Sequence, residues 1–278
     1  MCRGKNTHGQ LGRGNVSESG AFLKTGLVDH SPMSGPMKRF RAISAHGMRA
    51  CGISEEGRIW CWGNNAYGTL QTNQGIAVSK MVEIKAPPSL MAENRWRSVS
   101  VGSYHTCGIA SNGTAFCWGK NNSGELGDNK TSTQSVKPRL VVTDNTNFTT
   151  EKWKQVEAGT SFTCGLAGDG RVYCWGRGTE GQIGTAAANS SPKPITIATN
   201  HITTAKRFRR IAVGYQQACG IAVDGKVWCW GKDGFTQNNK PTLLDTKAVL
   251  GDPSAMDISI ASQSVCILTV EGRTYCMG

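Results

Sequence analysis

A segment with two cysteines recurs along this chain and constrains its fold more than any other feature. The clearest copy runs from Thr106 to Gly127 and carries cysteine, glycine, a turn with glycine, and then cysteine, tryptophan and glycine. The second cysteines lie at positions 2, 61, 117, 174, 229 and 276, so they recur every 47 to 59 residues. A period of this length indicates an array of supersecondary units. We divide the single 1–278 array into repeats at about 5–63, 64–119, 120–176, 177–231 and 232–278, with 1–4 as the end of a truncated repeat.

Each copy is predicted to form a β-hairpin. Two apolar runs flank a three-residue loop that ends in glycine, as in Ser111-Asn112-Gly113, which suits a type I turn followed by a left-handed residue. With the turn centred there, the first cysteine falls opposite the second at a non-hydrogen-bonded site, where the two side chains are close enough for a disulfide. We therefore expect five disulfides, namely Cys51–Cys61, Cys107–Cys117, Cys164–Cys174, Cys219–Cys229 and Cys266–Cys276.

The cysteines allow a second interpretation, in which each is a small buried apolar residue of a strand. Five pairs in one register favour disulfides, which indicate an oxidising compartment. Each disulfide would close an 11-residue loop and contribute at most about 2.5–3 kcal/mol. Cys2, which has no counterpart, is interpreted as a consequence of truncation rather than as a reactive thiol.

Two further strands are predicted in every repeat. A Pro-marked edge strand, such as Lys137–Val142, follows the polar loop, and an aromatic-led strand, such as Trp96 to Val99, precedes the first cysteine. Together with the hairpin this gives four short strands, and four-stranded units repeated side by side predict an all-β fold of the β-propeller type.

The motif itself resembles a known repeat. Residues 102–127 follow the order Gly-X-X-X-X-Cys-Gly, a turn, and Cys-Trp-Gly-X-Asn-X-X-Gly-X-Leu-Gly. This order closely resembles the repeat of the regulator of chromosome condensation family, and the paired cysteines resemble its secreted or cell-surface branch, which includes bacterial extracellular repeat proteins and crinkly-type plant receptor kinase ectodomains. The resemblance implies a seven-bladed propeller, of which five complete repeats and a half-repeat would be a fragment. The departures are Arg3 and Met277 at the tryptophan position, Gln71 for the loop glycine, and a degenerate loop at 232–239.

No motif points to catalysis. The sequence has no CxxC, HExxH or GxSxG pattern, and the GxGxxG match that begins at Gly176 lies inside a repeat loop with no helix predicted after it. His105 occupies the position of Arg49, Phe162 and Gln217 in other repeats, so we interpret this position as a variable blade surface. We predict that the chain is not an enzyme and binds no cofactor, metal or small-molecule substrate.

The net charge of +12 has a periodic component. Basic residues flank the aromatic of four strands, and in a strand two such residues share one face. A basic arc of this kind would contact a polyanion such as an acidic polysaccharide, a phospholipid surface or nucleic acid; the alternative is a solvated strand face that protects an edge. The residues are Arg39, Arg41, Arg95, Arg97, Lys152, Lys154, Arg207 and Arg209.

Six Asn-X-Ser/Thr sites lie in predicted loops or at a hairpin tip, and we expect all of them to be accessible to glycosylation on a secretory route. They are Asn15, Asn112, Asn121, Asn129, Asn147 and Asn189.

Rigid repeats with divergent loops predict a binding scaffold, extracellular or at the cell surface, that recognises a protein or a glycan through its loops. No apolar run approaches the roughly 20 residues of a membrane-spanning helix. The alternative is a nuclear or cytoplasmic regulator, because the family's founding member is a nucleotide exchange factor for a small GTPase and binds chromatin. The basic charge fits that alternative, whereas paired cysteines do not fit a reducing nucleus. A third possibility, inhibition of an enzyme by plugging its active site, is compatible with the fold.

Overall fold

The computed structural model describes residues 2–16, 23–26, 28, 31, 39–72, 75–87, 95–143, 152–200, 202, 207–232, 237–244, 254–261 and 264–278. Within these ranges every regular element is a β-strand, apart from one 3-10 helix, η1 (Ala66–Gly68). The all-β prediction is therefore confirmed. The chain divides into two compact units, one formed by residues 1–121 and 132–140, the other by residues 122–131 and 141–278.

The first unit contains two four-stranded antiparallel sheets and one short strand pair. The sheets have the orders β3-β4-β5-β6 and β7-β8-β9-β10, and β1 pairs with β2. Their strands are β1 (Cys2–Gly4), β2 (Leu23–Gly26), β3 (Phe40–His46), β4 (Arg49–Ser54), β5 (Ile59–Asn64), β6 (Ala77–Glu83), β7 (Trp96–Val101), β8 (His105–Ala110), β9 (Ala115–Asn121) and β10 (Ser132–Leu140).

The second unit contains two four-stranded sheets and one three-stranded sheet, with the orders β11-β12-β13-β14, β15-β16-β17-β18 and β19-β20-β21. The strands are β11 (Trp153–Ala158), β12 (Phe162–Ala167), β13 (Val172–Gly176), β14 (Ser191–Thr196), β15 (Phe208–Val213), β16 (Gln217–Ala222), β17 (Val227–Lys232), β18 (Gln237–Leu243), β19 (Ala255–Ala261), β20 (Ser264–Thr269) and β21 (Thr274–Met277).

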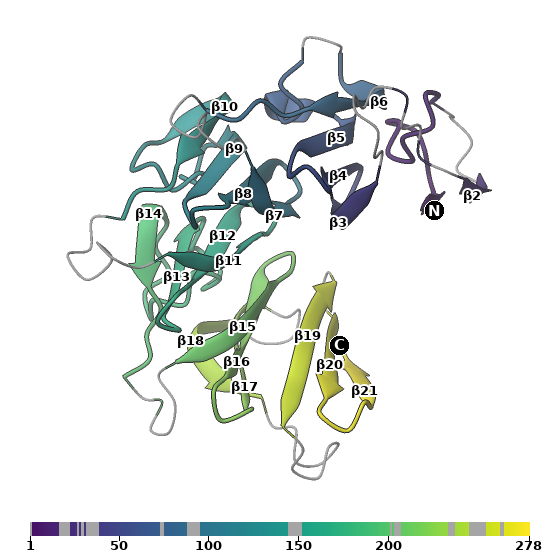
Figure 1. Ribbon diagram of the computed structural model, residues 1–278. Helices are drawn as coiled ribbons and strands as arrows, with labels where there is room; N and C mark the ends of the chain where they lie inside the picture. The colour runs from purple at the N-terminus through teal and green to yellow at the C-terminus, as the bar shows by residue number, and fades with distance from the viewer. Residues whose placement is uncertain are drawn as a thin grey trace. The chain divides into compact units, whose positions relative to one another are not determined.

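Every four-stranded sheet is a meander whose strands pair in chain order (Figure 1). This is the blade type of β-propellers, so the predicted fold class is confirmed. The sheets are offset from the sequence repeats, however. The Pro-marked strand, for example β10, follows the Cys-Trp-Gly segment in sequence but pairs with β9 of the preceding hairpin. Each four-stranded sheet thus takes its outer strand from the repeat that comes next.

The hairpins form as the sequence predicts. The last loop residue is a glycine with positive φ in all five, from 79° at Gly272 to 87° at Gly170. In the first hairpin the Gly57 N–H donates to the Ser54 carbonyl oxygen over 2.9 Å, which closes the turn. This phase places Cys51 opposite Cys61, and the same register recurs in the other four hairpins.

The outer strands share a bulge that the sequence did not indicate. In β10, Ser135 lies opposite Gly119 and Arg139 opposite Cys117, so four steps along β10 match two along β9. The same mismatch occurs in β6, β14 and β18. A bulge and a lysine both discourage another strand from pairing with a sheet edge. The residue at the middle of the bulge is a lysine every time: Lys80, Lys137, Lys193 and Lys240.

The tryptophan of each Cys-Trp-Gly segment bonds the polar loop at the start of its own repeat. The Trp175 indole Nε1 donates to the carbonyl oxygen of Glu125 over 2.9 Å, and both residues belong to the second unit. Equivalent bonds join Trp62 to Gln10, Trp118 to Thr69, and Trp230 to Gln182, over 2.8–3.0 Å. The Leu-Gly part of the motif therefore serves packing, since Leu70 and Leu126 are fully buried beside these carbonyls.

Candidate binding surfaces

All five predicted disulfides are present. Their Cα–Cα distances are 4.0–4.1 Å, as expected for facing residues at non-hydrogen-bonded sites. Four of them are buried among apolar side chains, as with Cys51 and Cys61, which are fully buried. These sulfurs therefore link strands of the same hairpin and are not exposed for thiol chemistry. Cys2 lies in β1, and its side chain is outside the described part of the structure.

The predicted basic arc is exposed, but part of it holds neighbouring sheets together. All eight residues are exposed. The Arg41 guanidinium donates to the carbonyl oxygen of Trp96, and the Arg209 guanidinium donates to the carbonyl oxygen of Ala255. In both cases the acceptor belongs to the first residue of the first strand of the next sheet. These arginines therefore have a structural role in holding neighbouring sheets together.

Arg207 contacts an acidic side chain rather than solvent alone. Its Nη1 lies 2.5 Å from Asp169 Oδ2, at the tip of the preceding hairpin. Burial by itself would raise the pKa of Asp169, but bonds from the Arg171 backbone N–H and from the guanidiniums of Arg207 and Arg171 lower it below its usual value. An incoming polyanion would have to compete with this carboxylate.

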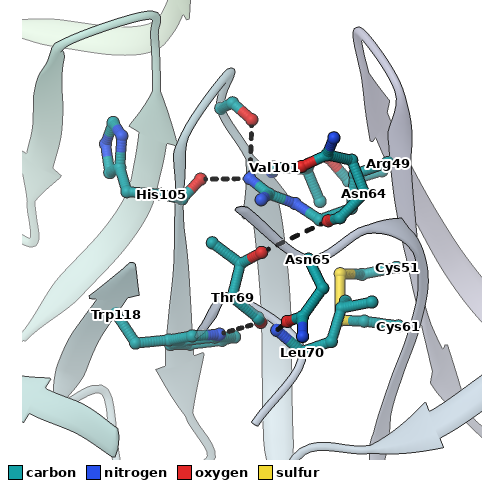
Figure 2. The surroundings of a disulfide bond; sticks show 12 residues. Arg49, Cys51, Cys61, Asn64, Asn65, Thr69, Leu70, Val101, His105 and Trp118 are labelled. Carbon is teal, nitrogen blue, oxygen red and sulfur yellow. Dashed lines mark hydrogen bonds between the residues drawn. A yellow bond between two sulfur atoms is a disulfide. The ribbon is translucent and has the colours of Figure 1, made fainter. Parts of the chain in front are cut away.

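The variable position that begins the second strand of each four-stranded sheet is buried, which corrects the blade-surface interpretation. Arg49, His105, Phe162 and Gln217 are all 5% exposed or less. The Arg49 Nη2 donates to the carbonyl oxygens of Gly102 and His105 over 2.8 and 2.9 Å (Figure 2). Variation at this position therefore does not indicate exposure.

Burial also affects the pKa values of Arg49 and His105. It lowers the pKa of Arg49 to about 9, so the guanidinium is charged at neutral pH. Burial first, and then the charges of Arg49, Lys120 and His46, lower the pKa of His105 to about 3. The His105 imidazole is therefore neutral near pH 7, and the buried position makes a role as an acid or base toward a substrate impossible without opening the fold.

One exposed tyrosine, one half-buried tyrosine and a half-buried lysine lie together in the first unit, at the sheet end from which the β7–β8 loop projects. The Tyr67 and Tyr104 rings meet edge to face, with centroids 5.6 Å apart. The Lys120 Nζ lies 5.4 Å from the centroid of the Tyr104 ring, and Tyr104 is 41% exposed. We call Tyr67, Tyr104 and Lys120 the tyrosine patch. Aromatic side chains with a polar tip are common at interfaces because they bury a large apolar area. The two tyrosines are specific to their repeats, so the consensus motif did not reveal the patch.

The Asn-X-Ser/Thr sites differ in exposure. Asn121 corrects the expectation of general accessibility, because it ends β9, is 1% exposed, and donates from Nδ2 to Ser132 Oγ over 3.3 Å. The equivalent Asn65 is also buried and accepts from the Leu70 N–H, so the motif asparagine organises the loop. Asn147 lies outside the described residues. The exposed sites are Asn15, Asn112, Asn129 and Asn189.

Two other kinds of site are absent from the described ranges. No group of three or more His, Cys, Asp or Glu side chains there could hold a metal ion. Likewise, none of the helical structure described is long and apolar enough to cross a membrane.

A family model of a known repeat matches the repeats of this chain. The model described as "Regulator of chromosome condensation (RCC1) repeat" matches residues 56–109, 112–166 and 169–221. The ultraviolet-B receptor UVR8 of Arabidopsis thaliana is 21% identical over 229 residues, which are 82% of this chain and 48% of the receptor. The probable E3 ubiquitin-protein ligase HERC6 of Homo sapiens is 27% identical over 244 residues, 82% of this chain and 21% of the ligase. The chain thus spans less than half the length of either relative.

Solved structures share the fold. Human WBSCR16 aligns with a TM-score of 0.74 and 18% identity, over 86% of this chain and 62% of that one. Prp20p from Saccharomyces cerevisiae, whose structure was described with its binding to Gsp1p and histones, aligns with a TM-score of 0.59 and 17% identity. The alignment covers 99% of this chain and 79% of that one. The crinkly ectodomain of the receptor kinase ACR4 from Arabidopsis thaliana aligns with a TM-score of 0.52 and 21% identity, over 89% of this chain and 71% of that one.

Proposed function

Because this chain belongs to the family of regulator of chromosome condensation (RCC1) repeats, we propose that it is a binding scaffold that recognises a partner protein through the tyrosine patch, outside the reducing cytosol. The observation that carries the proposal is the patch itself: two tyrosines in edge-to-face contact and a lysine over one ring, all on loops or strand ends of disulfide-linked sheets. A rigid aromatic pair loses little conformational entropy on binding, which favours it as an interface anchor.

The cysteines support the location. Five disulfides within one chain are typical of an oxidising compartment. The ectodomain among the similar structures is consistent with a cell-surface or secreted setting. In that setting the partner would be another extracellular protein. A glycan also stacks on tyrosine rings, and the experiment below distinguishes these two kinds of partner.

The experiment captures partners on the oxidised chain from cell-surface extracts, with and without prior enzymatic removal of glycans. The Y67A/Y104A variant should lose at least about 30-fold in affinity for the captured partner, the range of interface hot spots. Tyr215→Ala is the matched control, since Tyr215 is 51% exposed but lies in the second unit. Capture that survives the double variant, or that requires the glycans, would contradict protein recognition by this patch.

The second candidate is a chromatin-associated regulator or nucleotide exchange factor of a small GTPase. The net charge of +12 and the fold shared with Prp20p favour it. It requires the protein to work in a reducing compartment, where the five disulfides would be open thiols. Acceleration of nucleotide release from a small GTPase by fully reduced, folded protein would establish this candidate, whereas loss of the fold on reduction would count against it.

A further inference from the structure

A groove in the first unit, apart from the tyrosine patch, is lined by cationic side chains and by no acidic ones among the described residues. It has a volume of about 760 Å³ and lies between the segment that follows β6 and the bulged part of β10. Lys85, Lys137 and Arg139 bring three cationic groups to its walls, and none of the described residues that line it is acidic. The volume is within the range of pockets that hold ligands.

One wall of the groove is built by a departure from the repeat. In two other repeats the loop glycine accepts a backbone bond through its carbonyl oxygen, as Gly127 does from the Val142 N–H over 2.9 Å. At the same loop position Gln71 accepts the Lys85 N–H through its side-chain Oε1, also over 2.9 Å. Its Nε2 returns a bond to the Lys85 carbonyl oxygen over 3.4 Å. The Gln71 amide therefore holds the segment from Lys85 to Pro87 beside the groove.

The other wall is the bulge of β10. Ser135 Oγ accepts from the Arg139 Nε over 3.1 Å and donates to the Lys137 carbonyl oxygen over 2.8 Å, which fixes the bulge. Val136, 41% exposed, supplies an apolar surface between the charges. The bulge, Lys137 and Pro138 prevent an incoming strand from extending the sheet, so an occupant must be recognised through its side chains.

We propose that this groove binds a short extended peptide segment in which acidic residues alternate with an apolar residue. The carboxylates would meet Lys85, Lys137 and Arg139, and the apolar side chain would lie against Val136 and Pro87. Lys85 is available to exchange partners, because its bond to Glu83 over 3.0 Å lies at the surface and its side chain is 77% exposed. The groove and the tyrosine patch share no residue, so this binding is independent of the function proposed above.

The test measures binding of a fluorescein-labelled peptide of three alternating glutamate–valine pairs to the oxidised full chain by anisotropy. The K85Q/K137Q variant should bind at least about fivefold more weakly, because it removes two surface charge contacts. The matched control is K193Q/K240Q, which removes the same charge from equivalent bulges in the second unit and should bind as the wild type does. Both variants change exposed or half-buried surface lysines, and thermal unfolding checks that they fold.

Three results would overturn the proposal. Equal weakening by the two double variants would mean that net charge alone attracts the peptide. Equal binding of a peptide with glutamine in place of glutamate would remove the role of the carboxylates. Displacement of the peptide by a twelve-nucleotide oligothymidine, with the same sensitivity to K85Q/K137Q, would assign the groove to nucleic acid instead. Each of these results can be interpreted even if the tyrosine-patch experiment fails, because the two sites share no residue.

Discussion

The indole ring of Trp153 lies directly over Gly165, so closely that a Cβ on Gly165 would stand 2.2 Å from the ring carbon Cζ3. The first residue of an aromatic-led strand thus covers the glycine that follows the first cysteine of its own sheet. Phe40 over Gly52, Trp96 over Gly108, and Phe208 over Gly220 repeat the arrangement, with Cβ distances of 2.6–2.9 Å. In the last sheet both partners change together, since Ala255 replaces the aromatic and Ile267 replaces the glycine.

Gly165→Ala is therefore expected to destabilise the protein by about 1–3 kcal/mol, because the added methyl group has no room beneath the indole ring. Urea unfolding then compares Gly165→Ile and Trp153→Ala with the double variant W153A/G165I, which copies the last sheet. The two changes should be strongly non-additive, with the double variant more stable than the sum of the single effects predicts. Additive effects would show that the two positions do not share one packing space.

Trp118→Phe tests the bond from the indole to the Thr69 carbonyl oxygen, which measures 2.8 Å. It leaves a buried acceptor without its donor and should cost about 1–3 kcal/mol. Trp60→Phe is the control, because Trp60 is also buried at 5% exposure but its Nε1 has no hydrogen-bond partner among the described residues. Equal losses in thermal stability for the two variants would assign the effect to ring size instead of the hydrogen bond.

The disulfides predict a thiol count. The eleven cysteines minus the ten that are paired leave Cys2, so denatured protein that has not met reductant should titrate about one thiol, and reduced protein eleven. Cys107→Ala with Cys117→Ala should lower the free energy of unfolding by at most about 2.5–3 kcal/mol, since the pair closes a short loop. Three or more thiols before reduction would show that the hairpins are not all linked in the isolated protein.

His105 predicts a loss of stability in acid. Its pKa is about 3 in the folded chain against 6.5 in the unfolded chain, so the unfolded state takes up the proton first. Its contribution is fully present above pH 6.5 and is lost as the pH falls toward 3, by up to about 1.4 kcal/mol per pH unit. His105→Gln, which places there the residue found at Gln217, should flatten the dependence of unfolding free energy on pH between 6.5 and 4. An unchanged slope would exclude His105 as its source.

Much of this fold could be predicted from the sequence because its local rules repeat. The glycine turns and the facing cysteines follow from a fixed offset, which the register Cys164 to Cys174 confirms. What could not be predicted depends on neighbours outside the motif. The inward direction of Asn121 depends on Ser132, and the burial of Arg49 depends on two carbonyl oxygens in the next sheet. The tyrosine patch and the groove also need residues that the other repeats lack, such as Tyr67, Tyr104 and Gln71.

The bulged outer strand has a practical consequence for anyone who wishes to divide the array. A fragment that spans residues 95–143 contains all four strands of one sheet, from β7 to β10. A fragment cut at the sequence repeat, 64–119, would carry β6 without the strand it pairs with and would leave β9 bare along one side. Grafting, circular permutation or exchange of single modules should therefore place the junctions before the aromatic-led strand.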